Sequence, residues 1–166
     1  MSDRHLAAYL NDHLAGSVVA LELLGHLETE HAGAPIAEFA SILRPEIEED
    51  RGTLQALMAH LAIGESAPRK AAAWLAEKLT DLKLRFDDRG GVLRTLEIVE
   101  ALALGIDGKR CLWAALEAAS DVHLALRTVD YGPLQGRARD QRRRVEPFRL
   151  ESAKLAFGTP PVAEKG

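Results

Sequence analysis

The chain has 166 residues, of which 47% are apolar and 28% are charged, and its net charge is −4. This length fits one domain that buries about two-thirds of the surface its unfolded chain would expose. The composition is typical of globular proteins and argues against a disordered chain or a coat for nucleic acid. The single cysteine, Cys111, excludes an internal disulfide and any site built from several cysteines.

The N-terminal residues carry no targeting signal that we can recognise. They lead directly into an amphipathic stretch and hold no apolar core followed by a small-residue cleavage site. No segment reaches the roughly 18 uninterrupted apolar residues that a membrane span requires. We therefore expect a cytoplasmic protein with no membrane partner.

Long stretches rich in Ala, Leu, Glu and Arg, interrupted by Gly and Pro, predict an all-α protein with five or six helices. Gly33-Ala34-Pro35 separates the first two helices, and Gly64 is the predicted stop of the second. Prolines inside two of the helices, Pro45 and Pro147, predict bends. The expected helices span about 2–31, 35–63, 66–86, 92–104, 109–129 and 133–157.

The run Gly105-Ile106-Asp107-Gly108 predicts a helix stop followed by a new N-cap. Because such a turn is short, the helices on either side of it are expected to lie antiparallel. We expect one helical domain over residues 1–157 and a flexible C-terminal tail over residues 158–166.

Carboxylates inside apolar helical stretches are the main functional signal. Between Leu14 and Gly25, Ser17 is the only polar residue besides Glu22, and a lone buried carboxylate is costly unless it has a partner. Asp50 shares the predicted buried stripe of the second helix. Inward carboxylates from several helices are how bundles hold metal pairs, and the two predicted hairpins bring such residues together. The candidate metal ligands are Glu22, Glu46, Glu49, Glu97 and Glu100.

Four segments of the chain carry a resemblance to known proteins. They are Tyr9-Leu10-Asn11-Asp12-His13-Leu14-Ala15-Gly16, Glu46-Ile47-Glu48-Glu49-Asp50-Arg51, Trp74-Leu75-Ala76-Glu77-Lys78 and residues 96–109. Over about residues 5–157 the chain resembles an uncharacterised group of bacterial proteins with a ferritin-like fold. The resemblance implies an antiparallel four-helix bundle with kinked or broken helices and an additional C-terminal helix, and it implies no particular function.

The candidate ligands depart from the ferritin-like metal pattern. Ferritin-like di-iron and di-manganese proteins place one glutamate on each of two helices and a Glu-x-x-His motif on each of the other two. None of Glu46, Glu49, Glu97 and Glu117 is followed by histidine three residues later. Oxygen ligands alone suit Mn²⁺ or Mg²⁺ better than redox-active iron. We expect no cofactor, with iron or manganese as the alternative.

Simpler explanations exist for the same residues. Glu22 is expected to pair with Arg44 or another basic side chain across the first hairpin. The acidic run 46–50 could form a solvent-exposed face of its helix instead of a metal site. The arginines of the last helix suit phosphate contact in principle, but salt bridging to the acidic second helix or to a second subunit is the preferred interpretation. They are Arg137, Arg139, Arg142, Arg143, Arg144 and Arg149.

Three functions remain in competition. The first is a non-catalytic helical bundle that acts through self-association, as a homodimer, or through protein binding. The second is a carboxylate-rich protein that stores or oxidises iron or manganese. The third and weakest is nucleic-acid binding, which we do not expect from an acidic chain. No catalytic residue is assigned, because the sequence holds no nucleophile–base pair, phosphate loop or dinucleotide fingerprint.

Overall fold

The computed structural model describes residues 2–66, 73 and 91–158. Over these residues the chain is helical and contains no strand, which confirms the all-α prediction. The predicted helix over about 66–86 and most of the predicted tail lie outside the described residues. The described elements are α1 (Ser2–Glu30), α2 (Pro35–His60), α4 (Val92–Ala119), the 3₁₀ helix η1 (Leu124–Thr128) and α5 (Tyr131–Phe157).

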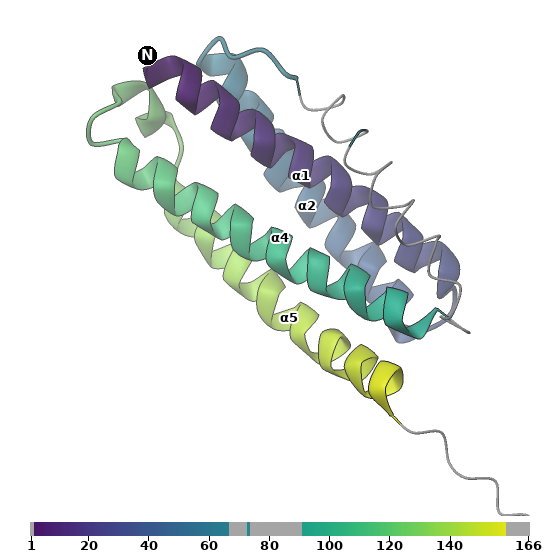
Figure 1. Ribbon diagram of the computed structural model, residues 1–166. Helices are drawn as coiled ribbons and strands as arrows, with labels where there is room; N and C mark the ends of the chain where they lie inside the picture. The colour runs from purple at the N-terminus through teal and green to yellow at the C-terminus, as the bar shows by residue number, and fades with distance from the viewer. Residues whose placement is uncertain (1, 67–72, 74–90, 159–166) are drawn as a thin grey trace, which may run out of the picture.

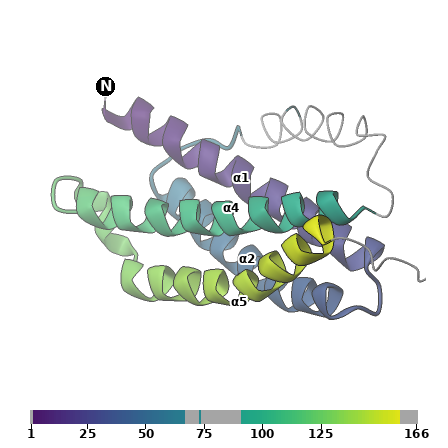
Figure 2. The same cartoon turned by 60° about the horizontal axis from the view of Figure 1, so that its bottom comes forward.

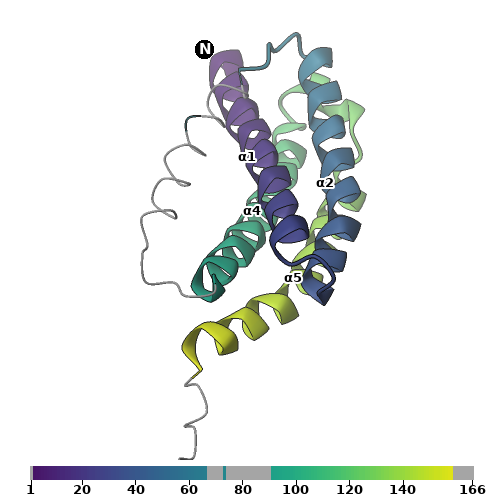
Figure 3. The same cartoon turned by 90° about the vertical axis from the view of Figure 1, so that its right-hand side faces the viewer.

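The long helices lie side by side (Figure 1). α1 and α2 form an antiparallel hairpin, α4 packs against α1, and α5 returns along α4, which is its main partner. α2 and α4 run in the same direction, as Figures 1 and 3 both show. The C-terminal part of α5, the helix that contains Pro147, is turned relative to its N-terminal part (Figure 2), in agreement with the predicted bend. None of the described helices is long and apolar enough to cross a membrane.

The ends of α1 and α2 follow the sequence closely, with one correction. α2 ends at His60 with Leu61 as its C-cap, and Ala62 takes the left-handed conformation with φ 54°. The N–H of Ile63 donates to Met58 O at 2.9 Å, and the N–H of Ala62 donates to Ala59 O at 3.0 Å. This is a Schellman motif with alanine where glycine is usual. The predicted stop at Gly64 was therefore two residues too late.

The predicted break at residues 105–108 is wrong. α4 is one continuous helix from Val92 to Ala119. The helix predicted over about 109–129 extends beyond this end, into residues that form the 3₁₀ helix η1. The buried stripe passes through the run, since Leu102, Ile106 and Trp113 are all at most 3% exposed. Burial along one face therefore overrides the helix-breaking tendency of two glycines, which costs only about 1 kcal/mol each.

The core has two parts, and the space between them holds the polar groups described below. One part lies near the α1–α2 turn and the other near the opposite end of the bundle. The first includes Leu24, Leu27, Leu43, Ile47, Ile98, Leu102, Ile106 and Val145. The second includes Leu10, Leu14, Leu54, Leu57, Met58, Leu112, Trp113, Leu116 and Tyr131.

Candidate functional site

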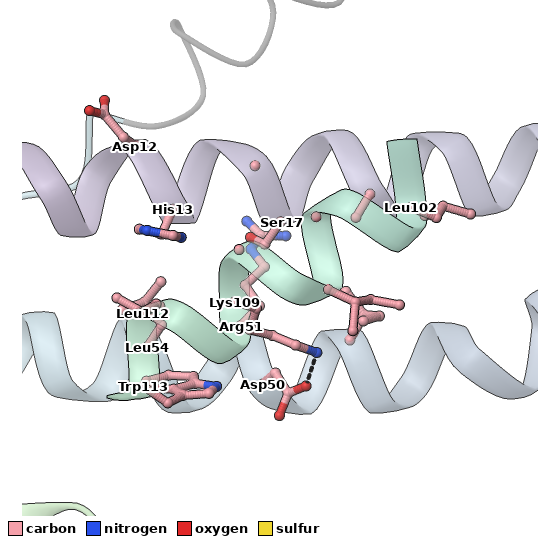
Figure 4. Close-up of a pocket in the computed structure, with 16 residues that line it drawn as sticks. Asp12, His13, Ser17, Asp50, Arg51, Leu54, Leu102, Lys109, Leu112 and Trp113 are labelled. Atoms are coloured by element: carbon pink, nitrogen blue, oxygen red, sulfur yellow. Dashed lines mark hydrogen bonds and ion pairs between the residues drawn. The ribbon is translucent and has the colours of Figure 1, made fainter. Parts of the chain in front are cut away.

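A cavity of about 160 Å³ lies between α1, α2 and α4 (Figure 4). Apolar side chains form most of its wall, among them Ala20, Ile47, Leu54, Leu102, Ile106 and Leu112. The polar groups that also line it are His13, Ser17, Asp50, Arg51, Lys109 and Trp113.

Glycines are one reason why this space is open. Gly16 of α1 and Gly105 and Gly108 of α4 all line the cavity, and a Cβ atom at any of them would meet no atom within 4 Å. Gly105 and Gly108, which suggested a helix break, therefore leave α4 continuous and leave room beside it.

A buried carboxylate forms the floor of the cavity. The side chain of Asp50 is 1% exposed, which confirms its predicted place on the buried stripe of α2. Lys109 Nζ of α4 donates to its Oδ2. From α5, Arg137 Nε donates to Oδ1 at 2.8 Å and Gln141 Nε2 donates to Oδ2 at 3.3 Å. Asp50 thus joins three helices through one carboxylate.

The network continues along the interface of α2 with α5. Arg144 donates to Glu46, and Gln141 Nε2 donates to the same carboxylate at 3.1 Å. Arg137 Nη1 donates to Glu49 at 2.6 Å. Arg137 and Arg144 therefore bind the acidic second helix, as the preferred interpretation expected. Arg142, Arg143 and Arg149 instead pair with acids of α4 and of α5 itself. The carboxylates Asp50, Glu46 and Glu49 are balanced by the cations Lys109, Arg137 and Arg144.

Burial and charge act against each other on the ionisable groups here. Burial lowers the pKa of Lys109, and the nearby charge of Asp50 only partly offsets it. Burial also lowers the pKa of His13, against a smaller opposite effect of Asp12. For Glu46, burial raises the pKa, but hydrogen bonds from Arg144 and Gln141 outweigh it, so the pKa lies below its ordinary value.

Two residues that line the cavity each carry a buried N–H donor without a hydrogen-bond partner in the part of the chain that the structure describes. These donors are Nε of Arg51 and the indole Nε1 of Trp113, and both atoms are buried. The Trp113 residue is only 1% exposed. Among the described residues, no carboxylate forms an ion pair with Arg51. Buried donors are almost always bonded, so two in one cavity are an unusual feature.

The expectation that Glu22 faces inward is wrong. Glu22 is exposed on α1, because the buried stripe of this helix runs through Leu10, Leu14, Leu24 and Leu27. Arg44, its expected partner, instead forms a two-pronged bond with Glu28, with Nε–Oε1 and Nη2–Oε2 distances of 2.9 Å.

The other predicted ligands are spread over two helices. Glu46 and Glu49 of α2 are bound by arginines, as described above. Glu97 is half-buried on α4, and Glu100 accepts a bond of 3.4 Å from Arg149. Because α4 is continuous, Glu97 and Glu117 lie about 30 Å apart instead of facing each other.

The predicted ligands do not converge on one point. Within residues 2–66, 73 and 91–158, no group of three or more His, Cys, Asp or Glu side chains is arranged to hold a metal ion. The metal site itself stays a prediction.

Several residues of the site were not predicted from the sequence. Lys109 and Gln141 were missed because neither stands out among the polar residues next to it in the sequence. Arg51 and Trp113 were missed because neither belongs to a motif. One Glu-x-x-His spacing, Glu28 to His31, was also passed over. In the structure the two side chains have different partners: Glu28 binds Arg44, and His31 Nε2 lies 3.0 Å from Thr95 Oγ1 of α4.

Comparisons of the chain with family models, with curated proteins and with solved structures found no match. The site therefore has to be interpreted from its own geometry. That geometry is an apolar-walled cavity with surplus N–H donors, next to a network whose charges are already matched.

Proposed function

We propose that the chain is a non-catalytic helical bundle of the ferritin-like type whose cavity binds a small, mostly apolar molecule. The cavity of about 160 Å³ carries this proposal. The exposed residues Asp12, Gly16 and Gly105 also line it, so the space reaches solvent. An apolar cavity of about 150 Å³ is large enough to bind benzene. A ligand seated there would remove the apolar wall from water, which favours binding.

The arrangement of the helices supports the ferritin-like part of the proposal. α2 and α4 run in the same direction, so the end of α2 and the start of α4 lie at opposite ends of the bundle. One long crossover of this kind distinguishes ferritin-like bundles from simple up-and-down ones.

Titration with toluene, followed by NMR, tests the proposed binding. Wild type is expected to show saturable shifts of cavity residues. Gly108→Leu places a side chain in the open space and should abolish the shifts. Gly52→Leu is the matched control, because Gly52 is also helical, has no atom within 4 Å of a built Cβ and does not line the cavity. Absence of saturable shifts in the wild type would refute the proposal.

Self-association as a homodimer is the second candidate. Large apolar side chains are exposed on α4 and at the end of α5, where Leu104 is 73%, Leu155 62% and Phe157 73% exposed. Such side chains favour contact with another protein surface when they form a patch. Sedimentation velocity over a range of concentrations tests this. A monomer at every concentration would exclude it.

A further inference from the structure

The two unpartnered donors restrict what the cavity can bind. Arg51 of α2 and Trp113 of α4, the residues that carry these donors, both line the cavity. Figure 4 places the indole nitrogen on the side of Trp113 that faces Asp50, between the two helices. A buried donor without an acceptor is destabilising, because it has lost its water and gained nothing in return. A ligand with acceptor oxygens would satisfy both donors.

A cationic ligand has no equivalent partner in the cavity. Asp50, the buried acid, already accepts hydrogen bonds from Lys109, Arg137 and Gln141. Asp12, the other acid that lines the cavity, is exposed, and its carboxylate points away from the space in Figure 4. A donor-rich or positively charged ligand would therefore compete with cations that are already bound.

The charge balance favours an anion. The carboxylates of Glu46, Glu49 and Asp50 are matched by Lys109, Arg137 and Arg144. Arg51 is left as a cation at the cavity without an ion pair among the described residues. A single negative charge next to Arg51 would be neutralised. Two negative charges would leave one uncompensated in an apolar space, which is costly.

Resting on the proposed function, we infer that the ligand is a small monocarboxylate with a compact apolar body, and that Arg51 and Trp113 bind its carboxylate. The cavity volume of about 160 Å³ fits a body of about four to six carbons beside the carboxylate. The apolar wall formed by Ile47, Leu54, Leu102 and Ile106 would contact that body.

Three probes of matched shape test this inference: toluene, benzoate and benzylamine, with dissociation constants from calorimetry or NMR. Benzoate is expected to bind at least about tenfold more tightly than toluene, since a charge-assisted hydrogen bond contributes that much or more. Benzylamine should bind no better than toluene. Arg51→Met should remove the preference for benzoate over toluene. Arg143→Met is the control, because Arg143 is 81% exposed and pairs with its helix neighbour Asp140.

A second measurement does not depend on a cavity variant. In a Trp74→Phe background, Trp113 gives the remaining indole N–H signal, which should move downfield with benzoate and not with toluene. Toluene binding without any preference for benzoate would overturn the inference and leave the proposed function standing. Failure of all three probes to bind would overturn both. A preference for benzylamine would reverse the assigned charge of the ligand.

Discussion

Replacing Asp50 by Ala tests whether the bundle depends on its buried polar network. The Asp50 carboxylate is 1% exposed, and the Lys109 side chain that binds it is 15% exposed. Removing the carboxylate leaves a buried ammonium group without its counter-charge and takes one acceptor from Gln141. Breaking one member of a buried ion pair costs about 3–5 kcal/mol. That loss is a large part of the about 5–15 kcal/mol that stabilises a typical domain.

The double variant Asp50→Leu with Lys109→Met separates the value of the pair from the cost of breaking it. Removing both charges together leaves no unpaired ion, and Arg137 keeps its bond to Glu49. We therefore expect the double variant to be more stable than Asp50→Ala, because apolar replacement of a whole buried pair is often neutral. Glu151→Ala is the surface control. Its pair with Lys154 is 61% and 75% exposed, so the expected loss is below about 1 kcal/mol.

Urea unfolding followed by circular dichroism gives the free energies for this comparison. The expected loss for Asp50→Ala corresponds to a fall in Tm of roughly 6–20 °C for a domain of this size. If Asp50→Ala changes the free energy of unfolding no more than Glu151→Ala does, the network does not carry the stability assigned to it. A double variant less stable than the single one would show that the charges themselves are required.

Four other measurements follow from the same structure. Arg144→Glu should destabilise the bundle through repulsion from Glu46, whereas Arg143→Glu, at an 81% exposed position, should have little effect; equal losses would contradict this. His13 should titrate below 6.5 by NMR, because burial lowers its pKa. As the pH falls, His13 of the unfolded chain therefore takes up its proton before His13 of the folded chain does. The contribution of His13 to stability is thus complete above pH 6.5 and is lost as the pH falls below this value. His13→Gln should weaken this dependence of stability on pH. Ala62→Gly should raise the free energy of unfolding by up to about 1 kcal/mol, because glycine adopts the left-handed conformation without strain; a loss would contradict the helix end described here. Elemental analysis of protein purified without chelator should find less than about one equivalent of iron or manganese per chain, because the candidate glutamates are spread over the bundle or bound to arginine; two tightly bound ions per chain would establish the metal-binding alternative.

The helices were predictable where a local signal ends them. Pro35 at the first position of α2 fixes its start, and the sequence placed it correctly. The run 105–108 looked like a stop because glycine and aspartate are unfavourable inside a helix. Packing against α5 and α1 keeps α4 continuous there, and packing partners are invisible in the sequence of one segment.

Glu22 and Asp50 show what an apolar neighbourhood does and does not indicate. Glu22 lies in an apolar run of the sequence and Asp50 in an acidic run, yet Glu22 is exposed and Asp50 is buried. Leu21 and Leu23, the neighbours that made Glu22 look buried, are themselves half-buried, so the apolar run of α1 is wider than its buried stripe. Periodicity placed Asp50 correctly because it falls on the same stripe as Leu43, Ile47 and Leu54. Position on the stripe, rather than isolation in the run, is the useful signal.

The partners of Asp50 could not have been predicted individually. Lys109 is 59 residues away from it and Arg137 is 87, so their meeting depends on how three helices pack. The general pairing of an acidic α2 with an arginine-rich α5 was predictable, because it depends on the opposite charges of the two helices and not on which residues lie opposite each other. Once the packing of the helices is known, each acidic side chain of the network can be assigned its basic partner. Arg51 then stands out, because the cations around it have acids and it has none among the described residues, and this remainder points to an anion in the cavity.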